Sequence, residues 1–434
     1  MKIAVIGAGA AGLSAAHALK GRHEVLLYER ETRLGGHANT VTIDYDGAAI
    51  DVDTGFIVFN QRNYPNLVGL LADLGVDTRP TNMSFACAGG GVEWSSSFPR
   101  GVFAQKRNLF RPDFLGMLAD IRRFNTLARS DLMQARIGDL TLGGWLTLRR
   151  FGTGFRDRYL LPMGAAIWST TEGRIGDFPA ESFLRFLSNH DLLRFTPSRW
   201  RTVTGGSRVY VERIGERLGD SVRLGVGVTR VRRDGRGVII TDDSGREVSF
   251  DQVILACHAP RALALLADAD GEERALLGAI RYRANKAWLH RDPRLMPRRG
   301  SAWGSWNYVT GNPDKTGPYV TYWMNNLQGI DPTRPLFVSL NSPPPDPALT
   351  FGVWDYDHPQ FDGPALAAQR RFGAIQGRGG VWYAGAWLGY GFHEDAVTSG
   401  VKAALALGGA APWAFVDHRV AALGEASPAP RAAA

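Results

Sequence analysis

The chain has 434 residues, enough for two domains, and its 44% hydrophobic and 21% charged residues are ordinary for a globular enzyme. No stretch approaches the roughly 18 apolar residues of a membrane span, so we expect no such span. The two cysteines, Cys87 and Cys257, lie far apart in the sequence, so we expect no disulfide. Neither they nor the nine histidines show metal-ligand spacing, so we expect no metal. The net charge of +8 comes without a dense basic tract or a recognised nucleic-acid module, which argues against a nucleic-acid partner.

The opening residues change twice between strand-like and helix-like composition. Residues 2–6 form an apolar run typical of a strand, residues 13–19 are rich in alanine and leucine, and residues 25–28 form a second apolar run. Three glycines separate the first strand from the helix, and the second strand ends in Glu29. Strand, glycine turn, helix, strand and terminal acid together predict a dinucleotide-binding βαβ unit.

Each part of this unit has a physical role in holding a dinucleotide. Gly7 allows a tight turn, Gly9 lets the backbone approach a pyrophosphate, and Gly12 lets the helix pack closely against the strand. The N–H groups at the helix N-terminus, around Ala11, favour the phosphates. Glu29 can accept hydrogen bonds from ribose hydroxyls, and an acid at this position favours FAD or NAD over NADP.

The residues that follow Glu29 distinguish FAD from NAD. Residues 30–37, Arg-Glu-Thr-Arg-Leu-Gly-Gly-His, combine basic side chains with a Gly-Gly pair whose backbone amides can meet a second stretch of cofactor. Here the chain resembles the flavin amine oxidase and phytoene desaturase superfamily, whose E-x-x-x-R-x-G-G signature matches residues 29–36. The resemblance implies cofactor contacts from Arg30, Arg33, Gly35, Gly36 and His37.

Three later segments match the same superfamily in the same order. Residues 51–55, Asp-Val-Asp-Thr-Gly, resemble a segment beside the flavin, residues 225–231 resemble the strand whose valine backbone contacts adenine, and residues 381–400 resemble the C-terminal FAD signature. Residues 250–256 are expected to return a buried strand to the sheet. The resemblance therefore implies FAD, with further contacts from Thr54, Gly55, Val228, Gly385, Glu394 and Ala396.

The expected fold class is α/β (α+β), with an FAD-binding Rossmann-like domain and an inserted substrate domain built on a mixed sheet plus helices, as in the amine oxidases. We place the FAD-binding domain at residues 1–80, 200–275 and 375–420, and the substrate or membrane-facing domain at residues 81–199 and 276–374. The small polar tail, residues 421–434, is expected to be disordered. A homodimer is implied by the resemblance alone.

Two stretches of the first insert carry apolar residues at helical spacing beside arginines. One runs from Phe114 to Arg129, and the other runs from Phe183 to Arg201 and includes Arg194. Such faces either pack against the core, or rest in a membrane interface, or line the entrance for a lipid tail. The arginine excess has two readings as well, a genomic composition bias or a basic face for phospholipid headgroups.

The C-terminal signature bears on the reaction. Amine oxidases of this superfamily carry a tyrosine in the signature, where this chain has Phe392, and a lysine near flavin N5, for which Lys286 is the first candidate in the second insert and Lys315 the next. Phenylalanine replaces the expected tyrosine, and nothing in the sequence marks Lys286 beyond its position. Both points argue against amine oxidation, although Tyr390 or Trp387 can still supply an aromatic wall.

Over nearly its whole length the chain is most similar to a bacterial subgroup, the FAD-dependent methyl fatty acyl desaturases of furan fatty acid synthesis. The marks of this resemblance are residues 53–60, 302–308, 321–328, 356–359 and 384–395. It implies desaturation of a methyl-branched unsaturated fatty acyl chain, with hydride transfer to flavin N5 and reoxidation by O₂. The alternatives are a flavin amine oxidase and a non-catalytic flavoprotein scaffold for lipid-modifying enzymes.

An allylic oxidation needs an apolar tunnel and a group that takes a proton. The candidate base is His393, with Tyr390 second, and the alternative for His393 is a structural hydrogen bond or a flavin contact. Candidate wall residues are Phe56, Phe59, Trp306, Tyr322, Trp323, Trp387 and Phe392.

The expected partners are a phospholipid-bound acyl chain, the membrane surface and O₂. Because the first predicted strand begins at residue 2, we expect no signal peptide and a cytoplasmic protein, peripheral on the inner face of the membrane.

Overall fold

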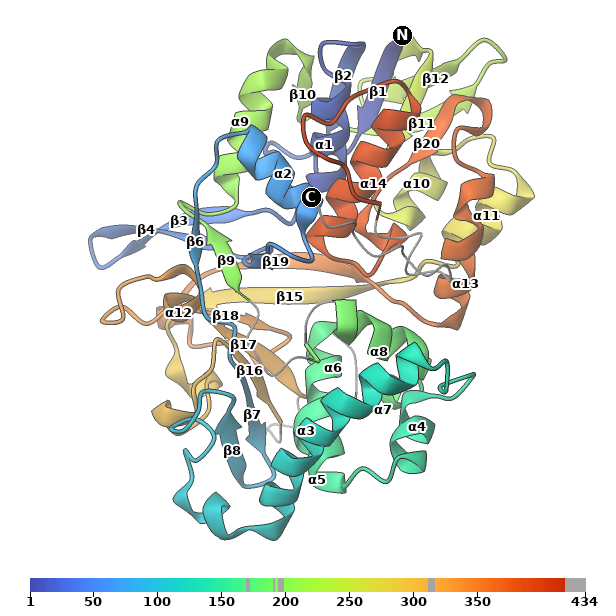
Figure 1. Ribbon diagram of the computed structural model, residues 1–434. Coiled ribbons are helices and arrows are strands. Elements are labelled where there is room, and N and C mark those ends of the chain that lie inside the picture. The colour runs from blue at the N-terminus through green and yellow to red at the C-terminus, as the bar shows by residue number, and fades with distance from the viewer. Residues whose placement is uncertain (169–171, 190–191, 194–198, 311–316, 418–434) are drawn as a thin grey trace, which may run out of the picture.

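The computed structural model describes residues 1–168, 172–189, 192–193, 199–310 and 317–417 (Figure 1). Arg194, Lys315 and the tail at residues 421–434 lie outside these ranges. The described chain has an upper region built on a parallel sheet and a lower region built on a second sheet with a group of helices beside it (Figure 1).

The βαβ unit predicted from the sequence forms the centre of the first sheet, which has five parallel strands. Its order is β10–β2–β1–β14–β20, with the strands β1 (Lys2–Ile6), β2 (Glu24–Glu29), β10 (Val222–Leu224), β14 (Gln252–Leu255) and β20 (Val381–Tyr383). The strand expected within residues 250–256 therefore lies between β1 and β20. Because both faces of a parallel sheet are covered, its strands read as continuous apolar runs.

Side chains along β1 alternate between two cores on opposite faces of the sheet. Ile3 and Val5 pack on the side of α1 (Ala10–Leu19), α2 (Pro65–Asp73), α9 (Arg208–Leu218) and α14 (His393–Ala406). Ala4 and Ile6 pack on the side of β11 (Val228–Arg233), β12 (Val238–Asp242), β13 (Glu247–Phe250), α10 (Ala259–Leu265), α11 (Gly271–Gly278) and α13 (Gly363–Arg371). Because all five strands of this sheet are parallel, their carboxyl ends lie at the same edge of the sheet.

The second sheet has seven strands and crosses the molecule below the first (Figure 1). Its order is β19–β15–β18–β17–β16–β7–β8, with β7 (Phe85–Gly89), β8 (Val92–Ser95), β15 (Tyr282–His290), β16 (Trp306–Val309), β17 (Tyr319–Trp323), β18 (Phe337–Leu340) and β19 (Thr350–Pro359). The β16–β7 pair is parallel and its neighbours are antiparallel, so the sheet is mixed. The predicted fold class, an amine oxidase-like α/β architecture with a mixed sheet, is confirmed.

In the described part of the chain, a group of helices packs beside the second sheet and includes α3 (Pro112–Met133), α4 (Leu142–Leu148), α5 (Thr153–Phe155), α6 (Leu161–Ile167), α7 (Glu172–Gly176) and α8 (Ala180–Asn189). Phe114 and Phe124 of α3 and Phe183 and Phe186 of α8 are all buried in one core. The apolar faces of α3 and α8 therefore pack inward, and the hypothesis that they rest in a membrane interface is wrong. No helix within the described ranges is both long and apolar enough to span a membrane.

Asp53 connects the upper region to the lower one. It ends β4 (Ala48–Asp53), which pairs with β3 (Thr40–Tyr45), and its carboxylate is buried. That carboxylate accepts hydrogen bonds from the Thr40 hydroxyl at 2.6 Å, from the Ser207 amide at 2.9 Å and hydroxyl at 2.7 Å, and from the Gln328 side chain at 3.0 Å. Gln328 belongs to α12 (Met324–Gln328), which follows β17 of the second sheet. Burial raises the pKa of Asp53, and the hydroxyl and amide donors oppose that shift.

A small three-stranded sheet also joins the two regions. Its order is β5–β9–β6, with β5 (Phe59–Asn60), β6 (Thr78–Pro80) and β9 (Trp200–Val203). It lies between the two larger sheets (Figure 1).

We expect Asp53→Ala to lower the free energy of unfolding by about 3 kcal/mol, because four buried donor groups lose their acceptor. The matched control is Asp51→Ala, two residues earlier on the same strand, whose side chain is 35% exposed and pairs with Arg208. A half-exposed pair contributes less than about 1 kcal/mol. Chemical denaturation followed by circular dichroism measures both variants, and equal losses would contradict a connecting role for Asp53.

Candidate functional site

The residues predicted to hold the cofactor gather where the parallel strands end. Gly7 follows β1, Glu29 ends β2, and Gly385 lies two residues after β20. His258, which the sequence analysis did not select, lies three residues after β14. Open α/β sheets bind their ligands outside the carboxyl ends of the strands, so this edge is the candidate site.

The glycine turn is shaped by contacts within the protein at two positions and is open at the third. A Cβ on Gly7, whose φ is +102°, would lie 2.8 Å from the Ala256 oxygen, and a Cβ on Gly12 would overlap the Gly7 oxygen. At Gly9, by contrast, a Cβ would meet no atom within 4 Å. Gly9 is the N-cap of α1, with no side-chain cap bond and no acid in the first turn. This open, uncapped helix start fits the pyrophosphate of FAD.

The Gly-Gly segment packs directly on that turn. The Gly35 amide donates to the Ala8 oxygen at 2.9 Å, and a Cβ on Gly36 would lie 3.2 Å from the Cα of Gly9. Arg33 donates to the Gly36 oxygen at 2.9 Å and braces the loop. Arg30 pairs with neighbouring Glu31 at the surface. The glycine turn at residues 7–12 and the Gly35–Gly36 pair therefore lie side by side, next to the open space at Gly9.

Glu29 and the predicted adenine-binding strand lie side by side. One Glu29 oxygen accepts the Ala8 amide at 2.7 Å and the other accepts the Glu31 amide at 3.0 Å, which leaves lone pairs for ribose hydroxyls. The Val226 amide donates to the Glu29 backbone oxygen at 3.0 Å, which brings the start of β11 to this carboxylate. The Val228 oxygen accepts a hydrogen bond from Arg261 at 3.0 Å.

The first turn of α1 packs closely against the middle of α14. A Cβ on Gly400 of α14 would overlap the Ala11 oxygen of α1, so glycine is required for this approach. The Gly385 amide donates to the Ser399 hydroxyl at 2.9 Å, and Ala396 lies in the first turn of α14. The C-terminal signature thus closes the site against the N-terminal βαβ unit.

Within the described ranges, four histidines face this region, and His37 and His393 are the two that the sequence pattern indicates. The His37 ring centroid lies 6.0 Å from that of His258 and 5.7 Å from that of His358. Tyr356 lies 4.9 Å from His37, and its hydroxyl is hydrogen-bonded to the Thr54 hydroxyl at 2.7 Å. Residues 356–359 were among the marks of the family resemblance, and that signal could have found His358. None of the described residues forms a metal-binding group of histidine, cysteine or acidic side chains.

Burial keeps these histidines neutral. It lowers the pKa of His37 well below its ordinary value, that of His358 to about 4 and that of His393 to about 3. Burial also lowers the pKa of His258. Repulsion between the rings lowers the pKa of His37 and of His358 further. The site therefore offers uncharged imidazoles at neutral pH.

His393 is held between two aromatic residues. Its ring stacks on Phe56 with centroids 3.8 Å apart, and its Nε2 and the Tyr210 hydroxyl are hydrogen-bonded at 2.7 Å. A histidine whose pKa is about 3 is a weak proton acceptor at neutral pH. The geometry thus favours the structural hydrogen bond, and the role of base stays a prediction. Tyr390 lies 5.6 Å from Phe186 between ring centroids.

Glu394 has a different task from the cofactor contact implied by the family resemblance. Its two carboxylate oxygens accept the Asn66 and Leu67 amides, each at 2.9 Å, at the start of α2. Burial raises the pKa of Glu394 to about 8, against the lowering effect of these amide bonds. Because both oxygens are engaged by α2, the structure argues against a cofactor role. Gly55 is also explained by packing, since a Cβ there would overlap the His37 oxygen.

The candidate wall residues divide between the site and the core. Phe59 and Trp387 are each 1% exposed, and the Trp387 indole donates to the Cys257 oxygen at 3.1 Å, so both pack in the core, and their role as substrate walls stays a prediction. Trp323 follows Tyr322 on β17 and therefore points to the opposite face, where it packs 5.5 Å from Trp303 between centroids. Packing partners far along the chain decide which of these aromatic rings are covered.

The remaining wall candidates have aromatic neighbours of their own, and their role as walls stays a prediction. Phe56 contacts His393, and Trp306 pairs with Tyr322 across β16 and β17. Phe392 stacks on Phe186 with centroids 5.3 Å apart. Phe186 in turn lies 4.6 Å from Trp168. A row of aromatic rings therefore leads away from the loop that carries His393.

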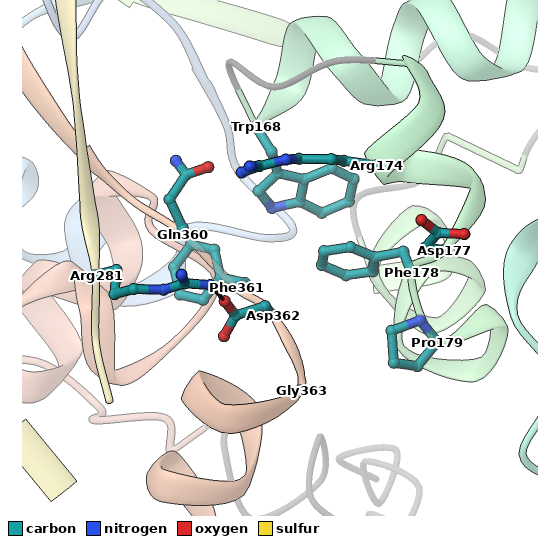
Figure 2. Close-up of a pocket in the computed structure, with 10 residues that line it drawn as sticks. All are labelled: Trp168, Arg174, Asp177, Phe178, Pro179, Arg281, Gln360, Phe361, Asp362 and Gly363. Carbon is teal, nitrogen blue, oxygen red and sulfur yellow. Dashed lines mark hydrogen bonds and ion pairs between the residues drawn. The ribbon is translucent and has the colours of Figure 1, made fainter. Parts of the chain in front are cut away.

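This row ends at a pocket of about 210 Å³ between the helices and the segment after β19 (Figure 2). Figure 2 shows the rings of Trp168, Phe178 and Phe361 turned toward the same space, with Arg174 and Arg281 approaching from opposite sides. The Trp168 indole nitrogen is buried and has no hydrogen-bond partner in the described chain. The remaining lining residues are Asp177, Pro179, Gln360, Asp362 and Gly363.

Comparison with known proteins agrees with this architecture. The sequence model of the family described as flavin containing amine oxidoreductase matches residues 10–304. AofH of Mycobacterium tuberculosis, whose name describes a flavin-containing monoamine oxidase, is 29% identical over 279 residues, which is 61% of this chain and 58% of that protein. The match thus spans little more than half of the relative's length.

Two solved structures illustrate the shared fold. Putrescine oxidase bound to putrescine is 18% identical with a TM-score of 0.66, covering 94% of this chain and 98% of that one. A fatty acid isomerase from P. acnes that produces CLA is also 18% identical with a TM-score of 0.66, covering 92% and 97%. At this identity the likeness establishes the fold alone.

Two glycine variants test whether the turn holds FAD. We expect Gly9→Ala to fold normally but to bind FAD at least about tenfold more weakly, a loss of about 1.4 kcal/mol, because its Cβ enters the space that fits the pyrophosphate. Gly12→Ala should instead lower the thermal midpoint of the protein itself, since its Cβ overlaps the Gly7 oxygen. Flavin absorbance per protein and titration of the apoprotein with FAD report binding. Unchanged FAD affinity in Gly9→Ala would place the pyrophosphate elsewhere.

A pH titration tests the neutral histidines. The folded pKa of His358 is about 4, below the ordinary 6.5 of the unfolded chain, so the folded state binds fewer protons between these values. Stability should therefore fall as the pH drops from 6.5 to 4, with His358 contributing up to about 1.4 kcal/mol per pH unit. His358→Gln should show a shallower decline than the unmodified protein in thermal unfolding across this range. Parallel curves would mean that His358 is protonated in the folded state.

Proposed function

The chain belongs to the flavin-containing amine oxidoreductase family, and within that family we propose that it desaturates a methyl-branched unsaturated fatty acyl chain rather than oxidising an amine. It is an FAD-dependent oxidoreductase, and bound FAD supplies the hydride acceptor of its reaction. In the proposed reaction the acyl chain loses a hydride and a proton and gains a second double bond. O₂ is the proposed final electron acceptor.

The observation that carries this proposal is the aromatic row between the pocket and the flavin-side loop. Trp168, Phe186 and Phe392 form a continuous series of apolar rings. An acyl chain has no charge or lone pair to hold, so it is best accommodated by such a route. At the outer end, the Arg174 guanidinium, which lines the pocket, can bind an ester or carboxylate oxygen.

The position of Lys286 also supports an acyl substrate. The amine oxidase resemblance implied a lysine near flavin N5. Lys286 lies on β15 with its side chain 49% exposed, and its Nζ donates to Asp355 at 2.8 Å. A lysine paired at the surface does not reach the reacting centre. Lys315, the other lysine considered, lies outside the described residues.

The chain's residues would exclude water and accept the proton. The histidines are uncharged, so no cation lies beside the apolar substrate. Binding the substrate beside a charged histidine would cost free energy, because water would have to leave that charge. His393 and Tyr390 stay the candidates for proton acceptor. We place the acyl chain in a phospholipid and the enzyme at the inner face of the membrane.

Amine oxidation is the second candidate function. The name of the M. tuberculosis relative favours it, and the solved putrescine oxidase shares the fold. Asp177 and Asp362 at the pocket can also attract an ammonium group. Asp362, however, is engaged with Arg281 and with the start of α13.

Anaerobic bleaching of the flavin separates these functions. The yellow protein is mixed with vesicles that contain methyl-branched unsaturated phospholipid and, separately, with a panel of amines. We expect loss of flavin absorbance with the lipid alone and a diene product by mass spectrometry. Bleaching by an amine alone would establish the second candidate. No bleaching by either would favour the non-catalytic scaffold.

Phe392→Tyr tests the apolar route directly. The added hydroxyl enters the contact with Phe186, where leaving it unpaired costs about 1–3 kcal/mol. We therefore expect kcat/KM for the acyl substrate to fall about tenfold, equivalent to about 1.4 kcal/mol. Trp323→Phe, on the opposite face of the second sheet, is the matched control and should change kcat/KM little. A gain of amine turnover in Phe392→Tyr would contradict the assignment.

A further inference from the structure

The segment that follows β8 and runs into the first turn of α3 exposes large apolar side chains that the rest of the described chain does not cover. Phe98 is 79% exposed and Phe110 is 84% exposed, while Leu109 and Leu115 are 45% and 43% exposed. We call residues 97–115 the apolar tip. Single exposed leucines are common on soluble proteins, but phenylalanines this exposed within one short segment mark an interaction site.

The apolar tip is a folded segment. The Gly101 amide donates to the Ser97 oxygen at 2.6 Å, and the Phe103 amide donates to the Pro99 oxygen at 3.1 Å. Val102 and Asn108 are buried. Lys106–Phe110 form a 3₁₀ helix that leads into α3. The segment thus buries part of its own residues and holds Phe98 and Phe110 outward.

Cations surround these apolar side chains. Arg100, Lys106 and Arg107 are exposed within the tip. Arg298 and Arg299 lie beside β8, the strand that leads into the tip, because their backbone amides donate to the Glu93 carboxylate at 3.3 and 3.0 Å. The acid of the tip, Asp113, pairs with Arg111 and Arg158, and these bonds lower the pKa of Asp113 to about 2. The exposed charge is therefore positive.

The tip lies at the lower end of the molecule, away from the five-stranded sheet (Figure 1). Insertion there leaves the FAD-binding edge undisturbed. An exposed apolar centre with a basic rim matches an anionic lipid surface, in which aromatic rings enter the interface and cations meet the phosphates.

We propose that residues 97–115 form a docking site for an anionic phospholipid bilayer. Phe98 and Phe110 enter the interface, and Arg100, Lys106 and Arg107 contact the headgroup phosphates. This inference deepens the proposed function, because it places the enzyme at a phospholipid-bound acyl chain. The docking itself does not depend on turnover.

Vesicle flotation with the FAD-loaded full chain tests the docking. The probes are vesicles of phosphatidylcholine alone and of phosphatidylcholine mixed with phosphatidylglycerol. We expect the protein to bind the mixed vesicles and the affinity to fall as salt is added. Each cation that contacts the headgroups should contribute about fivefold to the affinity at low salt. No binding to the mixed vesicles would overturn the proposal, and a tip-dependent dimer in light scattering would assign the surface to a second copy instead.

Two variants separate the apolar and the charged contributions. Phe98→Ser combined with Phe110→Ser should reduce vesicle binding by at least about tenfold. Arg100→Gln combined with Lys106→Gln should remove most of the preference for anionic vesicles. Full binding by the phenylalanine variant, or an undiminished anionic preference in the charge variant, would overturn the proposal. All four side chains are exposed, so the thermal midpoint should change little.

Matched controls lie elsewhere on the surface. Met133 is 80% exposed at the other end of the 22-residue α3, about 33 Å from its start, so Met133→Ser removes a comparably exposed apolar side chain away from the tip. Arg236→Gln with Arg274→Gln removes two exposed charges from the FAD-binding region. Both controls should bind vesicles as the unmodified protein does. Equal losses in the controls and in the tip variants would overturn the assignment to residues 97–115.

Activity toward a detergent-dispersed acyl substrate distinguishes the two proposals. If the tip variants lose vesicle binding but oxidise the dispersed substrate normally, docking and acyl oxidation both stand. If the variants lose vesicle binding while neither they nor the unmodified protein oxidises the lipid, docking stands and the proposed function fails. If the unmodified protein oxidises dispersed lipid yet binds no vesicles, the function stands and the docking fails.

Discussion

One buried carboxylate, that of Asp53, sets how the two regions of this molecule meet. It takes hydrogen bonds from Thr40 and Ser207 of the upper region and from Gln328 of the lower region. The next residue, Thr54, repeats the connection through the Tyr356 hydroxyl. The candidate site is assembled from both regions, so its dimensions depend on this contact. A buried acceptor with four donors permits few alternative arrangements, because any displacement leaves a polar group without a partner.

Burial also determines the charge of the candidate site, because it keeps the histidines there neutral. Histidines from four different segments come together where the parallel strands end, and desolvation holds their pKa values below neutrality. The helix start of α1, which has no acid in its first turn, supplies partial positive charge for phosphates without adding a titratable cation. An edge of this kind can hold an anionic cofactor and still present an uncharged surface to an apolar substrate.

The arginine-rich composition has more than one physical outcome. Arg149 pairs with buried Asp131, and Arg233 pairs with buried Glu273, so part of the excess stabilises the interior edges of the fold. Other arginines, such as those of the apolar tip, remain exposed. The apolar residues divide in the same way. The sequence pattern of α3 and α8 is amphipathic, and the apolar faces of both helices pack in the core. The exposed rings, Phe98 and Phe110, lie instead in the short segment before α3. Periodicity identifies a face but cannot say what covers it.

The sequence by itself determined the features that arise within short stretches of chain. The glycine turn, Glu29 and the Gly-Gly loop follow local rules of backbone conformation and spacing, and each lies at the edge that these rules predict. Tertiary structure decided everything that depends on partners far along the chain. It brought His258 and His358 to His37, and it covered Phe59 and Trp387 with core. It also turned Trp323 away from Tyr322 and gave Glu394 to the start of α2. Burial and facing are properties of packing between distant segments, and no pattern within a single segment specifies them.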